Sequence, residues 1–259
     1  MPSISRETDL IGSGFARYDL AKRFGISPDG DVNYKSLVAE FEDLPADPYA
    51  TEAGRFRRYG RGLYFPWSGQ FTWIPAPRDQ GGNEVNGYYQ GDHNPEYVGM
   101  VRTLPAISET ARTNPLLLDI LQFNFQQTRW NEVDSAWPMH VGVHLIKLSV
   151  EDAGEEAISS PNELHQDGEP FVFAHLIYRR NAVGGRNVIA PPRYRGLSPK
   201  DVPPDELMAE FELTEPLESY AITDAKVSHY VAPIMKGAES VPGERAVVLV
   251  DVVPMRQKI

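Results

Sequence analysis

The sequence contains no cysteine, so disulfides, zinc–thiolate sites, iron–sulfur clusters and cysteine nucleophiles are all excluded. Long apolar runs are also missing. No stretch approaches the length that crosses a bilayer, and the first residues, MPSISRE, lack the apolar core of a signal peptide. We therefore expect a cytoplasmic protein without a membrane partner, in which any metal is held by His, Asp, Glu or backbone oxygen.

Positive charge is in short supply, with 25 Lys and Arg against 36 Asp and Glu and a formal net charge of -11. Nucleic acids and anionic membranes bind clustered positive charge, so we expect neither as the main partner. The one basic cluster, RFRRYGR at residues 55–61, is short. At 259 residues, of which 41% are hydrophobic, the chain is long enough to bury a sizeable core.

We expect one domain over residues 1–259, with a helical and short-strand part at 1–135 and a β-rich core at 136–259. Apolar residues at helical spacing, and a proline that can begin a helix, predict helices in the first part. These helices fall within residues 15–24, 37–44, 98–107 and 115–121. Dense Gly, Pro and aromatic residues at 60–91 predict short strands joined by turns.

The second part reads as a series of short strands, which favours a sandwich or a small barrel. The predicted strands lie at residues 141–148, 171–178, 188–189, 210–213, 228–231 and 246–253. The pair Gly184-Gly185 predicts a turn, and hence a hairpin between the strands at 171–178 and 188–189.

Three residues in this part have the side chains of a metal site. His165 and Asp167 are two apart, so in an extended segment both side chains point the same way. With His229, they offer two imidazoles and one carboxylate. That set occupies one face of an octahedron, leaves three positions open and suits non-haem iron(II). Arg245, at the start of the last apolar strand, could bind a carboxylate with its planar guanidinium.

Several segments together resemble a known family of 2-oxoglutarate/iron dioxygenases, which includes bacterial L-isoleucine 4-hydroxylases. They are residues 141–147 (VGVHLIK), 165–168 (HQDG), 171–177 (FVFAHLI), 181–185 (NAVGG), 228–231 (SHYV) and 243–245 (GER). The resemblance extends more loosely to residues 55–61 and 88–90. Fungal relatives that oxidise small amino acids such as valine are similar too.

This resemblance implies a mainly β fold with flanking helices: a double-stranded β-helix, or jelly roll, preceded by N-terminal helices. It implies oxidation of a small free aliphatic amino acid, coupled to decarboxylation of 2-oxoglutarate to succinate, with Fe(II) and dioxygen. By the same resemblance, His165, Asp167 and His229 are the iron ligands and catalytic residues, and Arg245 binds 2-oxoglutarate. Because halogenases of this class lack the carboxylate ligand, Asp167 favours hydroxylation; desaturation and cyclisation stay open.

Other polar residues are weaker candidates. Arg57 and Arg58 could bind a substrate carboxylate, with a solvated basic turn as the alternative, and Gln90 could hydrogen-bond in the pocket. His144 could contact 2-oxoglutarate or substrate, or could be a hydrogen-bonded core histidine. We expect His175 to be structural. For the whole chain, a cupin-like metalloenzyme without 2-oxoglutarate and a non-catalytic jelly-roll binding module remain alternatives.

Overall fold

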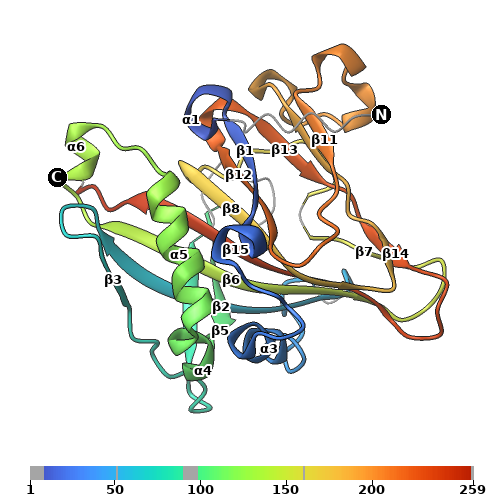
Figure 1. Cartoon of the computed structure of the whole chain (residues 1–259), viewed down its shortest axis with the longest axis horizontal. Helices are drawn as coiled ribbons and strands as arrows, with labels where there is room; N and C mark the ends of the chain where they lie inside the picture. Colours follow the sequence, from blue (N-terminus) through green and yellow to red (C-terminus); the bar gives the residue numbers. More distant parts are fainter. Residues whose placement is uncertain (1–8, 51, 90–98, 160, 258–259) are drawn as a thin grey trace.

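A computed structural model describes residues 9–50, 52–89, 99–159 and 161–257 (Figure 1). In this described part, the largest sheet has seven strands. In spatial order they are β1 (Phe15–Asp19), β12 (Glu218–Thr223), β8 (Phe171–Arg180), β15 (Gly243–Pro254), β6 (Met139–Val150), β2 (Arg55–Phe65) and β3 (Gln70–Trp73). All its strand pairs are antiparallel, which permits one face to line a core and the other to line a pocket.

Smaller sheets complete the β structure. They comprise β11 (Ala209–Phe211), β10 (Asn187–Ala190) and β13 (Ser228–Val231); β7 (Glu156–Ala157), β14 (Ile234–Lys236) and β9 (Ala182–Gly184); and β4 (Val85–Tyr89) with β5 (Val101–Pro105). The helices are α1 (Leu10–Ser13), α2 (Leu20–Phe24), α3 (Val32–Ala39), α4 (Glu109–Thr113), α5 (Pro115–Gln127) and α6 (Glu132–Ser135). No helix in the described ranges is both long and apolar enough to span a membrane.

The pleat of the large sheet separates a helix-covered face from a pocket face, because successive side chains of a strand point to opposite sides. On β6, Val143 and Leu145 join the apolar core that α3 and α5 cover (Figure 1), whereas His144 and Ile146 line a pocket. The strands β15 and β8 alternate in the same way, so the even residues of β15, such as Val248, contact the helical layer. The pocket therefore lies between the large sheet and the smaller sheets.

The mainly β character and most of the predicted strands are confirmed, as is the helix that begins at Pro115. Three helix predictions are wrong in part or whole. The helix expected at 37–44 begins earlier and ends earlier, since α3 covers Val32–Ala39. Phe15–Asp19 is an edge strand paired with β12, and only Leu20–Phe24 is helical. Val101–Pro105 is a strand paired with β4. In both segments, pairing with a distant strand overrides apolar spacing that resembles a helix.

The predicted hairpin across Gly184-Gly185 is also wrong. β8 belongs to the large sheet, whereas β10 pairs with β11 and β13 in a smaller sheet. Gly184 and Gly185 have φ values of 85° and 72°, a region that favours glycine. They turn the chain from β9, which pairs with β14, into β10 of another small sheet.

Candidate metal centre and its pocket

Backbone pairing brings His165 and His229 together. Each donates its backbone N–H to the carbonyl of the other, at 2.9 Å in both directions. Residues that exchange both hydrogen bonds lie directly opposite each other, with side chains on the same side. Their imidazole rings accordingly lie 4.2 Å apart, centroid to centroid.

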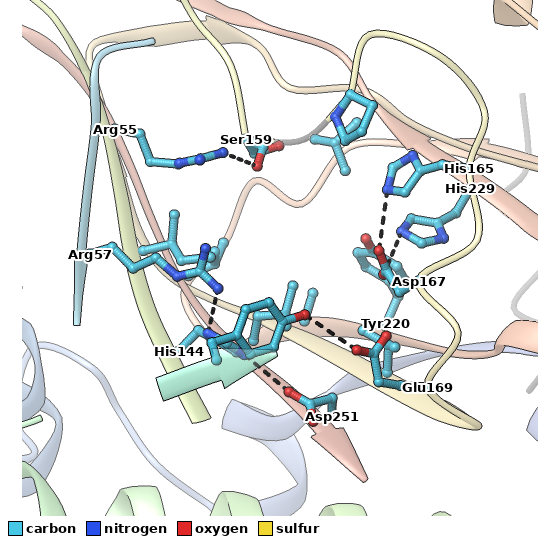
Figure 2. Close-up of a pocket in the computed structure, with 18 of the residues that line it drawn as sticks. Arg55, Arg57, His144, Ser159, His165, Asp167, Glu169, Tyr220, His229 and Asp251 are labelled. Atoms are coloured by element: carbon cyan, nitrogen blue, oxygen red, sulfur yellow. Dashed lines mark hydrogen bonds and ion pairs between the residues drawn. The ribbon is translucent and has the colours of Figure 1, made fainter. Parts of the chain in front are cut away.

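Asp167 completes a cluster whose possible ligand atoms all lie within 4.8 Å of one another. Its carboxylate lies 3.7 Å from His165 Nε2 and 3.3 Å from His229 Nε2 (Figure 2). His165 Nδ1 donates to the Glu163 carbonyl at 3.0 Å, which leaves Nε2 facing the other two ligands. Burial lowers the pKa of His165 to about 4, so its ring is neutral near pH 7, the form that binds a metal.

A second acid holds the turn that carries Asp167. The Asp224 carboxylate accepts the backbone N–H groups of Asp167 and Gly168 at 3.0 and 2.9 Å, and Gln166 donates its side-chain amide to the Asp224 carbonyl. Burial and the nearby Asp167 raise the pKa of Asp224. Gly168 has a φ of 88°. This support orients Asp167 toward the histidines, as partners behind metal ligands do. The two imidazoles, the carboxylate and this support fit iron(II).

Arg245 offers a buried cation on the pocket face of β15. It is 3% exposed, and its Nε has no hydrogen-bond partner among the described residues. Gly185 packs against its stem, since a Cβ there would lie 3.3 Å from Arg245 Cδ. Burial lowers the pKa of Arg245 to about 10, which still leaves it charged at neutral pH. A buried, charged guanidinium of this kind fits the carboxylate of 2-oxoglutarate.

On another wall, His144 links an arginine to an aspartate. Arg57 donates to His144 Nδ1 at 2.6 Å, and His144 Nε2 donates to Asp251 at 3.0 Å. Burial and then Arg57 lower the pKa of His144 well below its usual value, so the ring bridges the two charges as a neutral group. Gly142 gives Asp251 its space, because a Cβ there would lie 2.1 Å from the carboxylate.

Arg57 belongs to a cationic wall that faces the three possible metal ligands across the pocket (Figure 2). Arg55 pairs with the buried Asp47 at 2.8 Å. The ring of Tyr88 lies between Arg57 and Arg102, with guanidinium carbons 5.4 and 5.0 Å from its centroid. Burial and then Arg102 lower the pKa of Arg57 to about 10. This wall is therefore suited to an anionic group of a substrate.

Near the metal cluster, the pocket also contains Glu169. Tyr88 donates to Glu169 Oε1 at 3.3 Å, and Glu169 Oε2 is buried without a hydrogen-bond partner in the described part of the chain. Burial, together with the charges of Asp167 and Asp251, raises the pKa of Glu169 well above its usual value. Apolar side chains line the rest of the pocket: Ile146, Val172, Ala174, Val231, Val247 and Leu249.

The structure therefore brings His165, Asp167, His229, Arg245, His144 and Arg57 into one pocket. Arg58 lies on the other face of β2 and donates to the Ala106 carbonyl, so it does not line this pocket. Gln90 lies outside the described residues. His175 faces the helical layer, where it contacts Asn124 and Ser219, in keeping with a structural role.

The polar groups of the pocket and its support that were not expected from the sequence include Asp224, Glu169, Asp251 and Arg102. Two of them continue an alternating pattern. Glu169 is two residues beyond Asp167, and Asp251 is six beyond Arg245 on the same face of β15. Such period-two spacing could have indicated both. Asp224 and Arg102 reach the site only through long-range pairing, which no local pattern reveals.

Comparison with known proteins identifies similar chains. A family model described as 2OG-Fe dioxygenase matches residues 38–251. An L-isoleucine-4-hydroxylase from Bacillus thuringiensis is 32% identical over 152 residues, which cover 58% of this chain and 58% of that relative, somewhat more than half of its length. A 3(1)-hydroxy-L-isoleucine 4-dioxygenase from Pantoea ananatis is 24% identical over 244 residues, covering 93% of this chain and 89% of the relative.

A solved structure agrees with the fold. The Fe(II)/(alpha)ketoglutarate-dependent dioxygenase TqaL matches with a TM-score of 0.71 at 12% identity, covering 96% of this chain and 85% of that chain. At this level of identity the similarity shows the fold alone. It confirms the expected jelly-roll core with N-terminal helices.

Proposed function

This chain belongs to the 2OG-Fe dioxygenase family, and we propose that it oxidises an unactivated C–H bond of a small free aliphatic amino acid. The family uses Fe(II) as its metal cofactor and 2-oxoglutarate and dioxygen as cosubstrates, and 2-oxoglutarate is converted to succinate. The outcome for the amino acid is hydroxylation or, where the pocket directs it, desaturation or cyclisation. Amino-acid oxidation is supported by the names of the two curated relatives, both of which act on isoleucine or its derivative.

The observation that carries this proposal is that three possible metal ligands share one pocket with a buried arginine whose Nε has no partner among the described residues. His165, Asp167 and His229 would hold the iron, and Arg245 would hold a carboxylate of 2-oxoglutarate. Burying the charged Arg245 guanidinium costs free energy unless a ligand pairs with it. A cupin-like enzyme that does not bind 2-oxoglutarate would have no use for this buried charge. The family match speaks against this alternative and against a non-catalytic binding module.

Bound iron(II) would supply the open coordination positions at which 2-oxoglutarate and dioxygen react. The chain's own residues position the reactants. Arg57, held by His144, offers a cationic partner for the substrate carboxylate. The apolar wall that includes Val247 and Leu249 packs against an aliphatic side chain and excludes water from the reacting carbon. Asp167 occupies the position that a halogenase would leave open, which favours oxygenation.

The proposal extends to the whole chain. We propose that residues 1–259 act as one domain in the cytoplasm, with a small molecule as the partner rather than nucleic acid or membrane. The net charge of -11 supports the choice of partner. The iron site would lie in the part from 136 to 259, and β2, β4 and β5 of the preceding part add the cationic wall.

An anaerobic titration followed by an activity screen tests this function. Addition of iron(II) and 2-oxoglutarate to the folded protein should produce the weak visible charge-transfer band of the chelate. Succinate release should then be measured with each free amino acid in turn. Absence of the band in folded protein, or the same background succinate release with every amino acid, would refute the proposal.

A further inference from the structure

Glu169 is the one pocket carboxylate, among the described residues, that has a buried oxygen without a partner. Tyr88 donates to its other oxygen, Oε1, at 3.3 Å. Figure 2 shows Glu169 near Asp167 and Asp251, and across the pocket from Arg55 and Arg57. This carboxylate belongs neither to the three possible metal ligands nor to the hydrogen-bonded series of Arg57, His144 and Asp251.

The surroundings of the Glu169 carboxylate favour the binding of a cation. Two further acids, Asp167 and Asp251, line the same pocket as Glu169. A buried charge without a partner is costly, and an unsatisfied carboxylate oxygen is stabilised by a positively charged donor. No lysine lines the described pocket, and Glu169 forms no ion pair with any described residue. A cationic group of a bound molecule would supply this partner.

The two walls of the pocket have complementary charges. The guanidinium groups of Arg57 and Arg102 both contact the Tyr88 ring, and the Tyr88 hydroxyl contacts Glu169. A molecule that lies across Tyr88 would meet cations at one end and a carboxylate at the other. A free amino acid carries the matching pair, a carboxylate and an ammonium, next to an aliphatic chain that the apolar wall can accept.

We propose that Glu169 is a specificity-determining residue, which binds the α-ammonium group of the substrate through Oε2. This inference rests on the proposed amino-acid oxidation and names the group that selects a free amine. The substrate carboxylate then faces Arg57, and Tyr88 keeps Glu169 at the correct distance. Molecules that lack the amine, or carry it as an amide, leave Glu169 unpaired and are rejected.

The test compares L-isoleucine with its analogue without the amino group, 3-methylpentanoic acid. We expect the wild-type protein to have a higher kcat/KM for succinate release with the amino acid than with 3-methylpentanoic acid. Glu169→Gln should reduce this preference about 10- to 100-fold, the effect of losing one hydrogen bond between charged groups. The loss should be in KM for the amino acid, and the values for 3-methylpentanoic acid should change little. Calorimetry with both compounds under anaerobic conditions gives the same comparison without turnover.

Controls separate this inference from the function on which it rests. Glu210→Gln removes an exposed acid that pairs with Arg186, and should leave the preference unchanged. The iron–2-oxoglutarate band shows whether Glu169→Gln is folded and loaded. If it is not, Glu169→Asp, which withdraws the carboxylate, should reduce the preference several-fold. An unchanged preference in a loaded variant overturns the role of Glu169 alone. A wild-type band without a response to any amino acid overturns the proposed function and this inference together.

Discussion

The two walls of the pocket reach their charges in different ways. The metal wall consists of a turn and the short strand β13, and its possible ligand atoms lie close to one another, with His229 Nε2 3.3 Å from the Asp167 carboxylate. The cationic wall stands on the long strands β2, β6 and β15, where Arg57 and Asp251 both contact His144. One wall gathers three possible ligand atoms within 4.8 Å of one another; the other pairs its charges within the protein.

This difference follows from what each wall must bind. A metal site needs ligand atoms without competing partners, and partners placed behind them for orientation. A site for an organic anion needs cations whose positions are set before the ligand arrives, because ordering them on binding would cost affinity. Arg245 differs from the cationic wall in this respect, since its Nε has no hydrogen-bond partner among the described residues. Substitutions should therefore affect metal, cosubstrate and substrate separately.

The largest effect should come from the metal wall. Asp167→Ala removes the carboxylate ligand, and we expect metal retention after purification, and with it succinate release, to fall by more than about 100-fold. Asp224→Asn is the matched control, because Asp224 holds the turn without belonging to the cluster; its loss should weaken metal binding by about 10- to 100-fold. Metal content and amino-acid-stimulated succinate release measure both. Equal metal retention in Asp167→Ala and wild type would remove Asp167 from the metal site.

A change at Arg245 should separate cosubstrate from metal. Arg245→Gln removes the buried cation, and we expect the affinity for 2-oxoglutarate to fall about 10- to 100-fold, since hydrogen bonds to charged groups contribute roughly 1.5–3 kcal/mol. Metal content should not change. Arg186→Gln, an exposed arginine paired with Glu210 at 3.1 Å, is the control. Anaerobic titration of the charge-transfer band measures the affinity, and an unaltered value would favour the cupin-like alternative.

The cationic wall can be tested with two buried histidines on opposite faces of the large sheet. His144→Leu leaves Arg57 and Asp251 without their shared partner, so we expect a loss of about 3–5 kcal/mol in unfolding free energy and a higher KM for the amino acid. His175→Leu removes a partner only from the neutral Asn124 and Ser219, and the Ser219 hydroxyl still donates to the Leu217 carbonyl. It should cost about 1–3 kcal/mol and leave KM unchanged. Urea unfolding and succinate release distinguish the two; an equal KM in both variants would separate His144 from substrate binding.

The same two walls show what the sequence could predict. The metal wall depends on a local pattern, His165 and Asp167 at alternate positions, and on a second histidine that begins a recognisable strand. Both are visible without a structure. The cationic wall depends on register: Tyr59 lies opposite His144, and Leu249 lies opposite both His144 and Ala174. Local spacing does not determine which strands pair, so this wall could not be assembled from the sequence.

The alternation of side chains along β2 explains why Arg57 and Arg58 have different surroundings. Sequence reasoning treated Arg57 and Arg58 alike, as substrate partners or as a solvated turn. In the structure they are neighbours on β2, so their side chains point to opposite faces of the sheet. Arg57 enters the pocket and Arg58 contacts the Ala106 carbonyl. Strand assignment of residues 55–61 would have separated them, but a dense run of arginines is not a typical strand signal.

The smallest predicted effect concerns the pH dependence of stability, and it tests whether His175 is a neutral structural group. Burial lowers the pKa of His175 to about 3 from 6.5. Its Nδ1 donates to Ser219 at 2.8 Å, and its Nε2 accepts from the Asn124 amide at 3.1 Å, so the neutral ring is fully hydrogen-bonded. Protonation would place a second N–H against the Asn124 amide donor, inside the core.

The folded protein therefore binds this proton more weakly than the unfolded chain does. Its contribution to stability is fully present above pH 6.5 and is lost as the pH falls toward 3. Between pH 7.0 and 5.5, the wild-type protein should lose about 1.3 kcal/mol more unfolding free energy than His175→Leu. Other titrating groups, His144 included, are common to both proteins and cancel in the comparison. Urea unfolding at the two pH values gives the difference, and parallel losses in the two proteins would show that His175 does not have this depressed pKa.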